Sequence, residues 1–133
     1  MRVAYLDTED VLDLHALQLA AFGGTRGVRD LDLLSSTVAQ PQASALGPPL
    51  DEDIVAIAAG YLFHIVRDHP FVDGNKGAGL LAALVFLDVN GYAVPADAPQ
   101  LYDLTIGVAE GALSKDDVDA TLRRLARPKR EAH

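Results

Sequence analysis

The sequence predicts an all-α, single-domain bundle of about six helices, and three observations support this prediction. The chain has 133 residues, the length of one ordinary domain. Hydrophobic residues make up 50% of it, more than a disordered chain contains. Apolar residues recur at helical spacing between capping residues, and no stretch alternates apolar and polar residues for long enough to require a sheet. We expect the domain to cover residues 1–127, with 128–133 as a flexible tail.

The first helix is expected to begin at Asp7 or Thr8, either of which can cap it, and to extend to about Phe22. Two glycines then end the helix and open the segment 23–29, which contains a third glycine. Because glycine readily adopts positive φ, we expect this segment to be a loop or a short hairpin.

The second and third helices are separated by a loop rich in proline, glycine and alanine. Asp30 caps the second helix, which is expected to end near Gln40-Pro41, because the residue before a proline disfavours helical conformation. The acidic run Asp51-Glu52-Asp53 opens the third helix, whose apolar residues recur at helical spacing. This helix is expected to end at about Asp68, before His69-Pro70.

A fourth helix is expected from about Asn75 to Asn90-Gly91. Over residues 80–87 it is apolar on nearly every side, which predicts that it is the buried centre of the bundle. Asp97 and Ser114 are expected to begin the last two helices.

Composition excludes several classes of protein. The net charge of −8 argues against a general nucleic-acid binder, which needs a basic face to neutralise phosphates. The chain has no cysteine, so disulfides and thiolate metal sites are excluded. Its first residues lack the pattern of a secretory signal, and its longest apolar stretch is too short to span a bilayer. We therefore expect a cytoplasmic protein with no membrane contact and no direct nucleic-acid binding.

Basic residues are scarce outside the C-terminus. Without its last eleven residues, the chain has 18 acidic residues and only six basic ones. Four of these six lie in or beside the segment 23–29 or the loop between the third and fourth helices: Arg26, Arg29, Arg67 and Lys76. This placement is typical of an anion site, although scattered solubilising charge also explains it.

The loop before the fourth helix, His69-Pro70-Phe71-Val72-Asp73-Gly74-Asn75-Lys76, contains residues suited to phosphate chemistry. It enters a helix N-terminus, where free N–H groups and the helix dipole favour an anion. Gly74 lets the backbone approach a phosphate, and Lys76 adds a positive charge. Asp73 is an oxygen ligand suited to Mg²⁺, and His69 can accept a proton from a hydroxyl group. The loop thus has candidates for each requirement of phosphoryl transfer.

Each of these residues also has a structural interpretation, because a histidine can cap a helix and Asp-Gly is a common turn pair. Two other kinds of site are excluded by pattern. The chain has no P-loop motif, and His64 and His69 lack the spacing and the glutamate of an H-E-x-x-H zinc site. His15 and His64 lie within apolar helices and are interpreted as buried structural histidines.

The loop resembles the motif H-x-F-x-[DN]-[AG]-N-K-R of the Fic/Doc family in its Doc (death-on-curing) form. The similarity continues through residues 80–92, and the segment from Gly23 to Asp30 resembles the flap of the family. Further matches at 104–111 and 121–124 extend it over nearly the whole chain. The resemblance implies the all-helical Fic/Doc fold and a kinase toxin of a toxin–antitoxin module.

The resemblance also implies a role for each matching residue. His69 corresponds to the catalytic base, Asp73 to the ligand of Mg²⁺ on the nucleotide phosphates, and Gly74 with Asn75 to the anion hole. Lys76 stands where AMP-transferring Fic proteins have glycine. That difference implies an inverted ATP, which donates its γ-phosphoryl group.

The expected nucleotide-binding set also includes Gly77 and Arg67, the latter corresponding to a basic residue before the loop in Doc proteins. The implied cofactors are ATP and Mg²⁺. The implied substrate is a threonine of elongation factor Tu, whose phosphorylation arrests translation. The implied partner is a Phd-type antitoxin, whose C-terminal segment folds into a groove of the toxin.

Position 77 departs from the motif, because Gly77 stands where the family has arginine. An arginine there would bind phosphate bidentately, a contact worth roughly 1.5–3 kcal/mol. Gly77 and Gly79 also weaken the start of the helix by about 1 kcal/mol each relative to alanine. Three interpretations remain open: a Doc-type kinase, active or attenuated; a catalytically inactive module that binds the antitoxin; and a Fic-type AMP transferase, which Lys76 disfavours.

Overall fold

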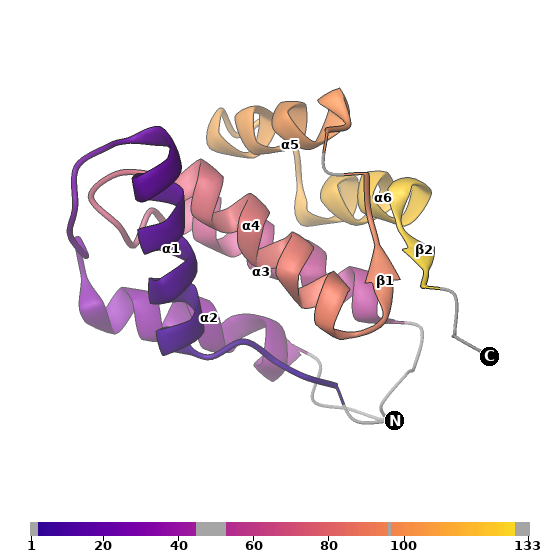
Figure 1. Ribbon diagram of the computed structural model, residues 1–133, viewed down its shortest axis with the longest axis horizontal. Coiled ribbons are helices and arrows are strands. Elements are labelled where there is room, and N and C mark those ends of the chain that lie inside the picture. The colour runs from indigo at the N-terminus through magenta and orange to yellow at the C-terminus, as the bar shows by residue number, and fades with distance from the viewer. Residues whose placement is uncertain (1–2, 45–52, 96, 130–133) are drawn as a thin grey trace.

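The computed structural model describes residues 3–44, 53–95 and 97–129 (Figure 1). Within these residues the chain forms six α-helices and one sheet of two short strands, which confirms the predicted all-α class. In chain order the elements are α1 (Thr8–Phe22), α2 (Leu31–Ser44), α3 (Ile54–Asp68), α4 (Asn75–Val89), β1 (Tyr92–Ala93), α5 (Pro99–Ala109), α6 (Lys115–Leu125) and β2 (Arg127–Pro128). None of the helices described is both long and apolar enough to cross a membrane.

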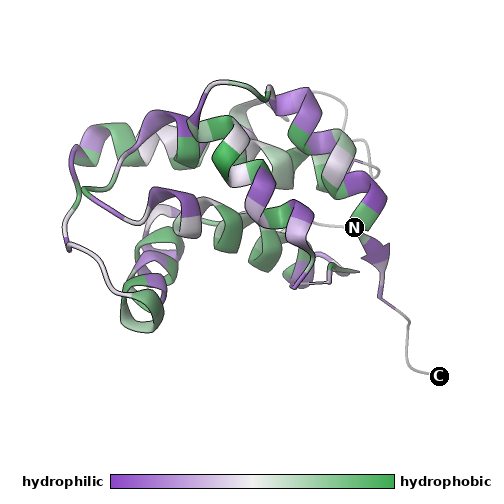
Figure 2. Cartoon of the chain, turned by 90° about the horizontal axis from the view of Figure 1, so that it is seen from above, coloured by the Kyte–Doolittle hydropathy of each residue, from purple (hydrophilic) through white to green (hydrophobic). Residues whose placement is uncertain are grey.

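The centre of the bundle is α3, which contacts α2, α4, α5 and α6. Eleven of its residues are buried, against seven in α4. The prediction that α4 is the buried centre was therefore wrong. The reason is that one side of α4, including Leu80 and Leu84, is only partly covered. In Figure 2 the outer helices carry both hydrophilic and hydrophobic segments, as expected for helices that cover a core on one face.

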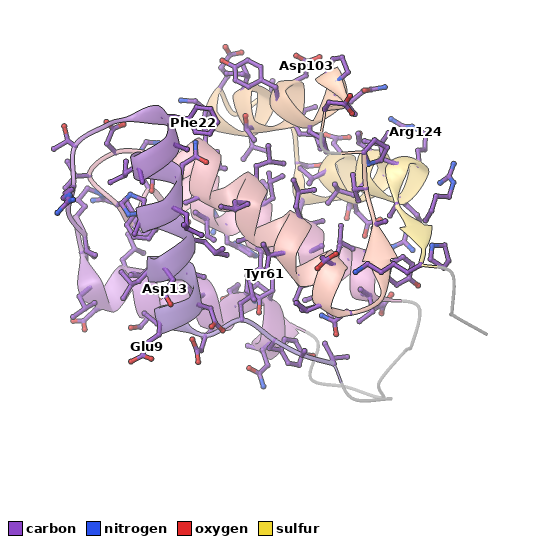
Figure 3. The ribbon with its side chains drawn as sticks, viewed as in Figure 1. Glu9, Asp13, Phe22, Tyr61, Asp103 and Arg124 are labelled. Carbon is purple, nitrogen blue, oxygen red and sulfur yellow. The ribbon has the colours of Figure 1, made fainter. Side chains whose placement is uncertain are left out.

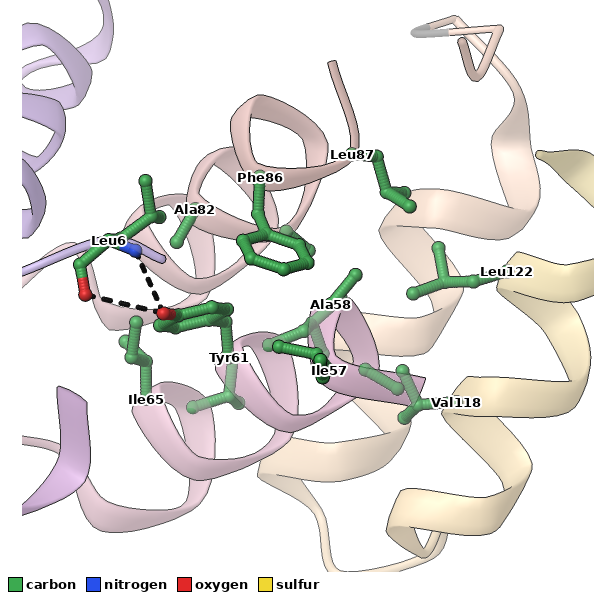
Figure 4. Packing of buried hydrophobic residues seen from close by; sticks show 14 of the residues in the cluster. Leu6, Ile57, Ala58, Tyr61, Ile65, Ala82, Phe86, Leu87, Val118 and Leu122 are labelled. Atoms are coloured by element: carbon green, nitrogen blue, oxygen red, sulfur yellow. Dashed lines mark hydrogen bonds between the residues drawn. The ribbon is translucent and has the colours of Figure 1, made fainter. Parts of the chain in front are cut away.

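Tyr61 of α3 ties the N-terminal segment to this core (Figure 4). Its ring is fully buried and packs against Phe86 of α4, with ring centroids 5.2 Å apart. Its hydroxyl accepts the N–H of Leu6 at 2.9 Å and donates to the carbonyl of Leu6 at 3.2 Å. Burial raises the pKa of Tyr61 to about 12, since ionisation would leave a charge inside the core.

Local signals set most helix ends. Asp7 caps α1 in a capping box with Asp10, and Ser114 caps α6 in the same way with Asp117. His69 ends α3 in the left-handed conformation, directly after Asp68 as predicted. Asp51 and Glu52, expected to open α3, lie outside the described residues.

Two predicted boundaries were wrong. The second helix does not end at Pro41 but continues to Ser44. Pro41 is buried against the Gly60 position of α3, where an added Cβ would lie 3.4 Å from the proline Cβ, so packing outweighs the lost backbone hydrogen bond. The fifth helix is capped by Ala98 rather than Asp97, because Pro99 takes a position in the first turn that needs no N–H.

The two short strands join the end of α4 to the C-terminal region. Tyr92 pairs with Pro128 and Ala93 with Arg127 in an antiparallel register. Lys129 then donates from its backbone N–H to the Gly91 carbonyl at 2.8 Å, and its ammonium group pairs with Asp88. The first two residues of the expected tail therefore contact the domain, while 130–133 lie outside the described residues.

Candidate active site

The loop between α3 and α4 is held against the glycine-rich segment 23–29, called the flap from here on. Val28 of the flap forms a bridge with Phe71. The N–H of Val72 donates to the carbonyl of Gly27 at 3.0 Å. Segments far apart in the sequence thus form one short antiparallel contact, and 23–29 is a loop, the first of the two predicted forms, rather than a hairpin of its own.

Arg29 braces this contact from the outside. Its backbone N–H donates to the Pro70 carbonyl at 2.8 Å. Its guanidinium group donates to the carbonyls of His69 at 2.6 Å and Asp68 at 2.8 Å. The positive charge of Arg29 therefore satisfies the C-terminal carbonyls of α3 and is not directed to an external anion.

His69 is the one residue other than glycine with positive φ in the described chain, at 54°. Its ring is held by Asn75, whose Nδ2 lies 3.1 Å from Nδ1 of His69. The orientation of the buried Asn75 amide follows from Phe71, which donates its N–H to Oδ1 and accepts from Nδ2, both at 3.0 Å. Nδ1 of His69 is therefore a hydrogen-bond acceptor, and the neutral ring carries its proton on Nε2.

Asp73 presents an ionised carboxylate at the surface. Its Oδ2 accepts the N–H of Thr25 in the flap at 3.0 Å, and its Oδ1 accepts the N–H of Gly74 at 2.8 Å. These two backbone donors, with smaller contributions from the charges of Lys76 and His15, lower the pKa of Asp73 below its usual value.

His15, from α1, packs against the loop and hydrogen-bonds to it. Its ring stacks on Phe71 with centroids 3.7 Å apart, and its Nε2 donates to the carbonyl of Asp73 at 2.8 Å. The predicted burial of His15 and His64 is confirmed. No local pattern predicts the contact between His15 and the loop, because the two partners are 58 residues apart.

These elements border a groove of about 490 Å³. Six of the predicted site residues line it: His69, Asp73, Gly74, Asn75, Lys76 and Gly77. Its other side is mainly apolar and comes from α1, α4 and α5, with Phe22, Leu80, Leu81, Leu84 and Tyr102. Figure 3 shows Phe22 at the end of α1 that lies nearest to α5. The groove thus joins a polar end to an apolar wall.

Arg67, the seventh predicted site residue, does not line the groove. Its guanidinium Nε pairs with Asp68 at 2.9 Å, its Nη2 lies 3.2 Å from Nδ1 of His64, and its charge lies over the Phe63 ring. Burial, followed by the charge of Arg67, lowers the pKa of His64. Arg26 borders a separate hollow beside α1. Of the four cations singled out in the sequence, Lys76 alone lines the groove of the described structure.

The first turn of α4 faces the groove. Gly74 caps the helix at a φ of 78° and no side chain caps its N–H groups, which remain available for an anion. Gly77 follows in this turn, and a Cβ added to it would collide with Nε2 and Cδ of Gln18 from α1. Gln18 was not singled out in the sequence, where nothing distinguishes it from other surface glutamines.

Asp73 is suited to an Mg²⁺ ion that is also bound by substrate phosphates, rather than to a metal site made of protein side chains alone. Among the residues described, no three histidine, aspartate or glutamate side chains come together. Mg²⁺ is commonly held by one or two carboxylates together with substrate phosphates and water. The ionised Asp73, beside an exposed helix N-terminus, matches that arrangement.

Comparison with known proteins agrees with the motif. The model of the Fic/DOC family matches residues 5–87. The chain is 36% identical over 121 residues to a protein named protein kinase doc from Escherichia phage P1. The aligned region covers 91% of this chain and 94% of that protein. It is 39% identical over 124 residues to a protein named toxin Doc from Mycolicibacterium smegmatis. Here the aligned region covers 92% of this chain and 93% of that protein.

Proposed function

The chain belongs to the Fic/DOC family, and on this premise we propose that it is the Doc-type toxin of a toxin–antitoxin module. In this proposal it is a kinase that uses ATP and Mg²⁺ to phosphorylate a threonine of elongation factor Tu in the cytoplasm. The observation that carries the proposal is the groove, in which a histidine, an ionised carboxylate and an uncapped helix N-terminus with Lys76 lie together.

The nucleotide phosphates would lie against the first turn of α4. Its free N–H groups and Lys76 supply positive potential there. Asp73 would hold Mg²⁺, which supplies further charge neutralisation of the phosphates when bound. The backbone donors from Thr25 and Gly74 keep Asp73 ionised and hold its carboxylate in place.

In the transfer step, the threonine hydroxyl oxygen forms a bond to the γ-phosphorus. The bond from that phosphorus to the bridging oxygen breaks, and ADP leaves with the electron pair. The hydroxyl proton moves to His69. Because the unprotonated nitrogen of neutral His69 is Nδ1, which Asn75 engages at 3.1 Å, proton uptake requires that this hydrogen bond be exchanged.

The test uses elongation factor Tu and ATP labelled at the α- or the γ-phosphate. We expect label on elongation factor Tu from the γ-phosphate only, and none with His69→Ala. Label from the α-phosphate would show that the protein is an AMP transferase and not a kinase. Absence of both labels, with the groove intact, would contradict both enzymes.

A non-catalytic module is the second candidate, and one observation favours it. Gly77 has no side chain to clamp a phosphate, where the family motif has arginine. In that case the groove would serve a Phd-type antitoxin, whose C-terminal segment would cover the apolar wall formed by α1, α4 and α5. The same partner is proposed for the active kinase, so antitoxin binding alone does not separate the two candidates.

A further inference from the structure

Gln18 occupies the space above position 77. It extends from α1 across the first turn of α4, where a Cβ on Gly77 would lie 2.6 Å from its Cγ and would collide with its Cδ and Nε2. Real Cβ atoms do not approach other atoms this closely. A side chain at position 77 and the present conformation of Gln18 therefore exclude each other.

The carboxamide of Gln18 lines the groove together with Asp73, Gly74 and Lys76. Within the described parts of the chain it makes no hydrogen bond, so its two N–H donors are available. By contrast, the amide of Asn75 in the same site is fully engaged with Phe71 and His69. Gln18 is thus a polar residue of the groove wall, beside the first turn of α4, without a hydrogen-bond partner in the described structure.

We propose that Gln18 is a phosphate-binding residue of this site, which donates from Nε2 to a phosphate oxygen of the nucleotide, and that Gly77 provides the room it needs. This inference rests on the proposed function. Gly77 is then not simply a loss of function, because a neutral donor from another helix partly replaces the arginine that the family motif has at this position. A neutral amide supplies a directed hydrogen bond without the charge of a guanidinium group.

The competing explanation is that Gln18 only covers Gly77 and has no contact with a ligand. In that case its loss would change stability slightly and leave nucleotide affinity unaltered. Affinity for MgATP, measured by calorimetry on the full chain beside the melting temperature of each variant, therefore separates the two explanations.

The variants are Gln18→Ala, Gln18→Glu, Gly77→Ala and the double variant Gln18→Ala/Gly77→Ala. The first is expected to weaken MgATP binding about tenfold, the usual effect of losing a hydrogen bond to a charged group. Gln18→Glu should weaken it further, because a carboxylate repels the phosphates. Gly77→Ala should weaken binding about as much as Gln18→Ala, since the new methyl group displaces Gln18. The double variant should be no weaker than either single variant.

Gln42→Ala is the matched control, because Gln42 is exposed on α2 and lies outside the groove. It is expected to bind MgATP like the parent. Gly77→Ala improves helix propensity, so its weaker binding would not reflect unfolding.

Two results would overturn the inference alone: MgATP affinity of Gln18→Ala and Gln18→Glu equal to that of the parent, or additive effects in the double variant. If the parent chain binds no MgATP, both the inference and the proposed function are overturned. If the parent binds and Asp73→Ala loses binding while the Gln18 variants do not, the proposed function survives without this residue.

Discussion

In the proposed kinase, the side chain at position 77 would influence how much positive charge the site brings to the phosphoryl group. Gly77 lies in the first turn of α4, where it lines the groove and faces Gln18 of α1. An arginine introduced there must displace Gln18, which is half-exposed and can rotate away. Substitution at these two positions therefore compares a charged side chain at position 77 with the neutral donor Gln18.

The double variant Gly77→Arg/Gln18→Ala should phosphorylate elongation factor Tu about tenfold faster than the parent, because a charge-assisted bidentate contact is roughly twice as strong as a neutral one. The rate is measured with γ-labelled ATP. In cells without the antitoxin, this variant should stop growth more effectively than the parent. Adding His69→Ala should abolish both effects, since the clamp without the base leaves the hydroxyl unactivated. A rate equal to that of the parent would show that Gly77 does not limit the enzyme.

Asp73 should govern the magnesium dependence of nucleotide binding. Asp73→Ala is expected to weaken ATP binding in Mg²⁺ but to change it little in EDTA, because the carboxylate acts through the metal. Since the pKa of Asp73 is held below its usual value by Thr25 and Gly74, the carboxylate stays ionised at neutral pH, and its contribution is lost only in strong acid. Calorimetric titration with and without Mg²⁺ checks this. Equal affinities for variant and parent in both buffers would remove Asp73 from the metal role.

Helix α4 packs more extensively on α3 than on any other helix of the described structure, and Gly79 lies in this contact. A Cβ added to Gly79 would lie 2.8 Å from Cγ2 of Val66 and 3.2 Å from the carbonyl oxygen of Leu62. Gly79 therefore has a structural role in helix packing, although glycine has a low helix propensity. It lets the two helices approach, and so it positions the N-terminus of α4 beside His69 at the end of α3.

Gly79→Ala should lower the free energy of unfolding by about 1–3 kcal/mol, because overpacking outweighs the gain in helix propensity. Gly60→Ala is the control in α3, where the added Cβ meets only ordinary contacts at 3.4–3.5 Å. It should be neutral or stabilise by up to about 1 kcal/mol. Urea denaturation of both variants measures the difference. Stabilisation by Gly79→Ala would contradict this close packing of α4 on α3.

At the scale of the whole molecule, Tyr61 joins the N-terminal segment, α3 and α4 in one core (Figure 4). Its hydroxyl is the hydrogen-bond partner of both backbone groups of Leu6. Stability of the fold should therefore depend on this group in a way that pH can reveal.

Tyr61→Phe should cost about 1–3 kcal/mol at neutral pH, because the buried N–H of Leu6 loses its partner. The pKa of Tyr61 is raised to about 12, so the unfolded chain releases this proton near pH 10 while the folded chain retains it. Stability of the parent should consequently fall as pH rises from 10 to 12, by up to about 3 kcal/mol from this group. The variant should lack this part of the loss. Parallel alkaline profiles for parent and variant, measured by urea denaturation, would contradict the assignment.

Local sequence patterns were enough to predict the helical class, most helix ends and six residues that line the groove. Capping residues such as Asp7 and Ser114 act within one turn, and His69-Pro70 ends α3 locally, so these features can be read from neighbouring residues. Asp73, before α4, and Lys76, in its first turn, are three positions apart, so the motif singled out both without knowledge of the fold.

Tertiary packing, not local sequence, brings together groups that are far apart in the chain. Three such contacts join residues between 48 and 59 positions apart, which no local pattern specifies: Gln18 with position 77, His15 with Asp73, and Thr25 with Asp73. Packing also overrode local preference when α2 continued through Pro41 against α3, and when α3 rather than α4 became the centre. The physical reason is the same in each case: burial and long-range hydrogen bonds depend on which surfaces meet, whereas propensities and caps depend on the next few residues alone.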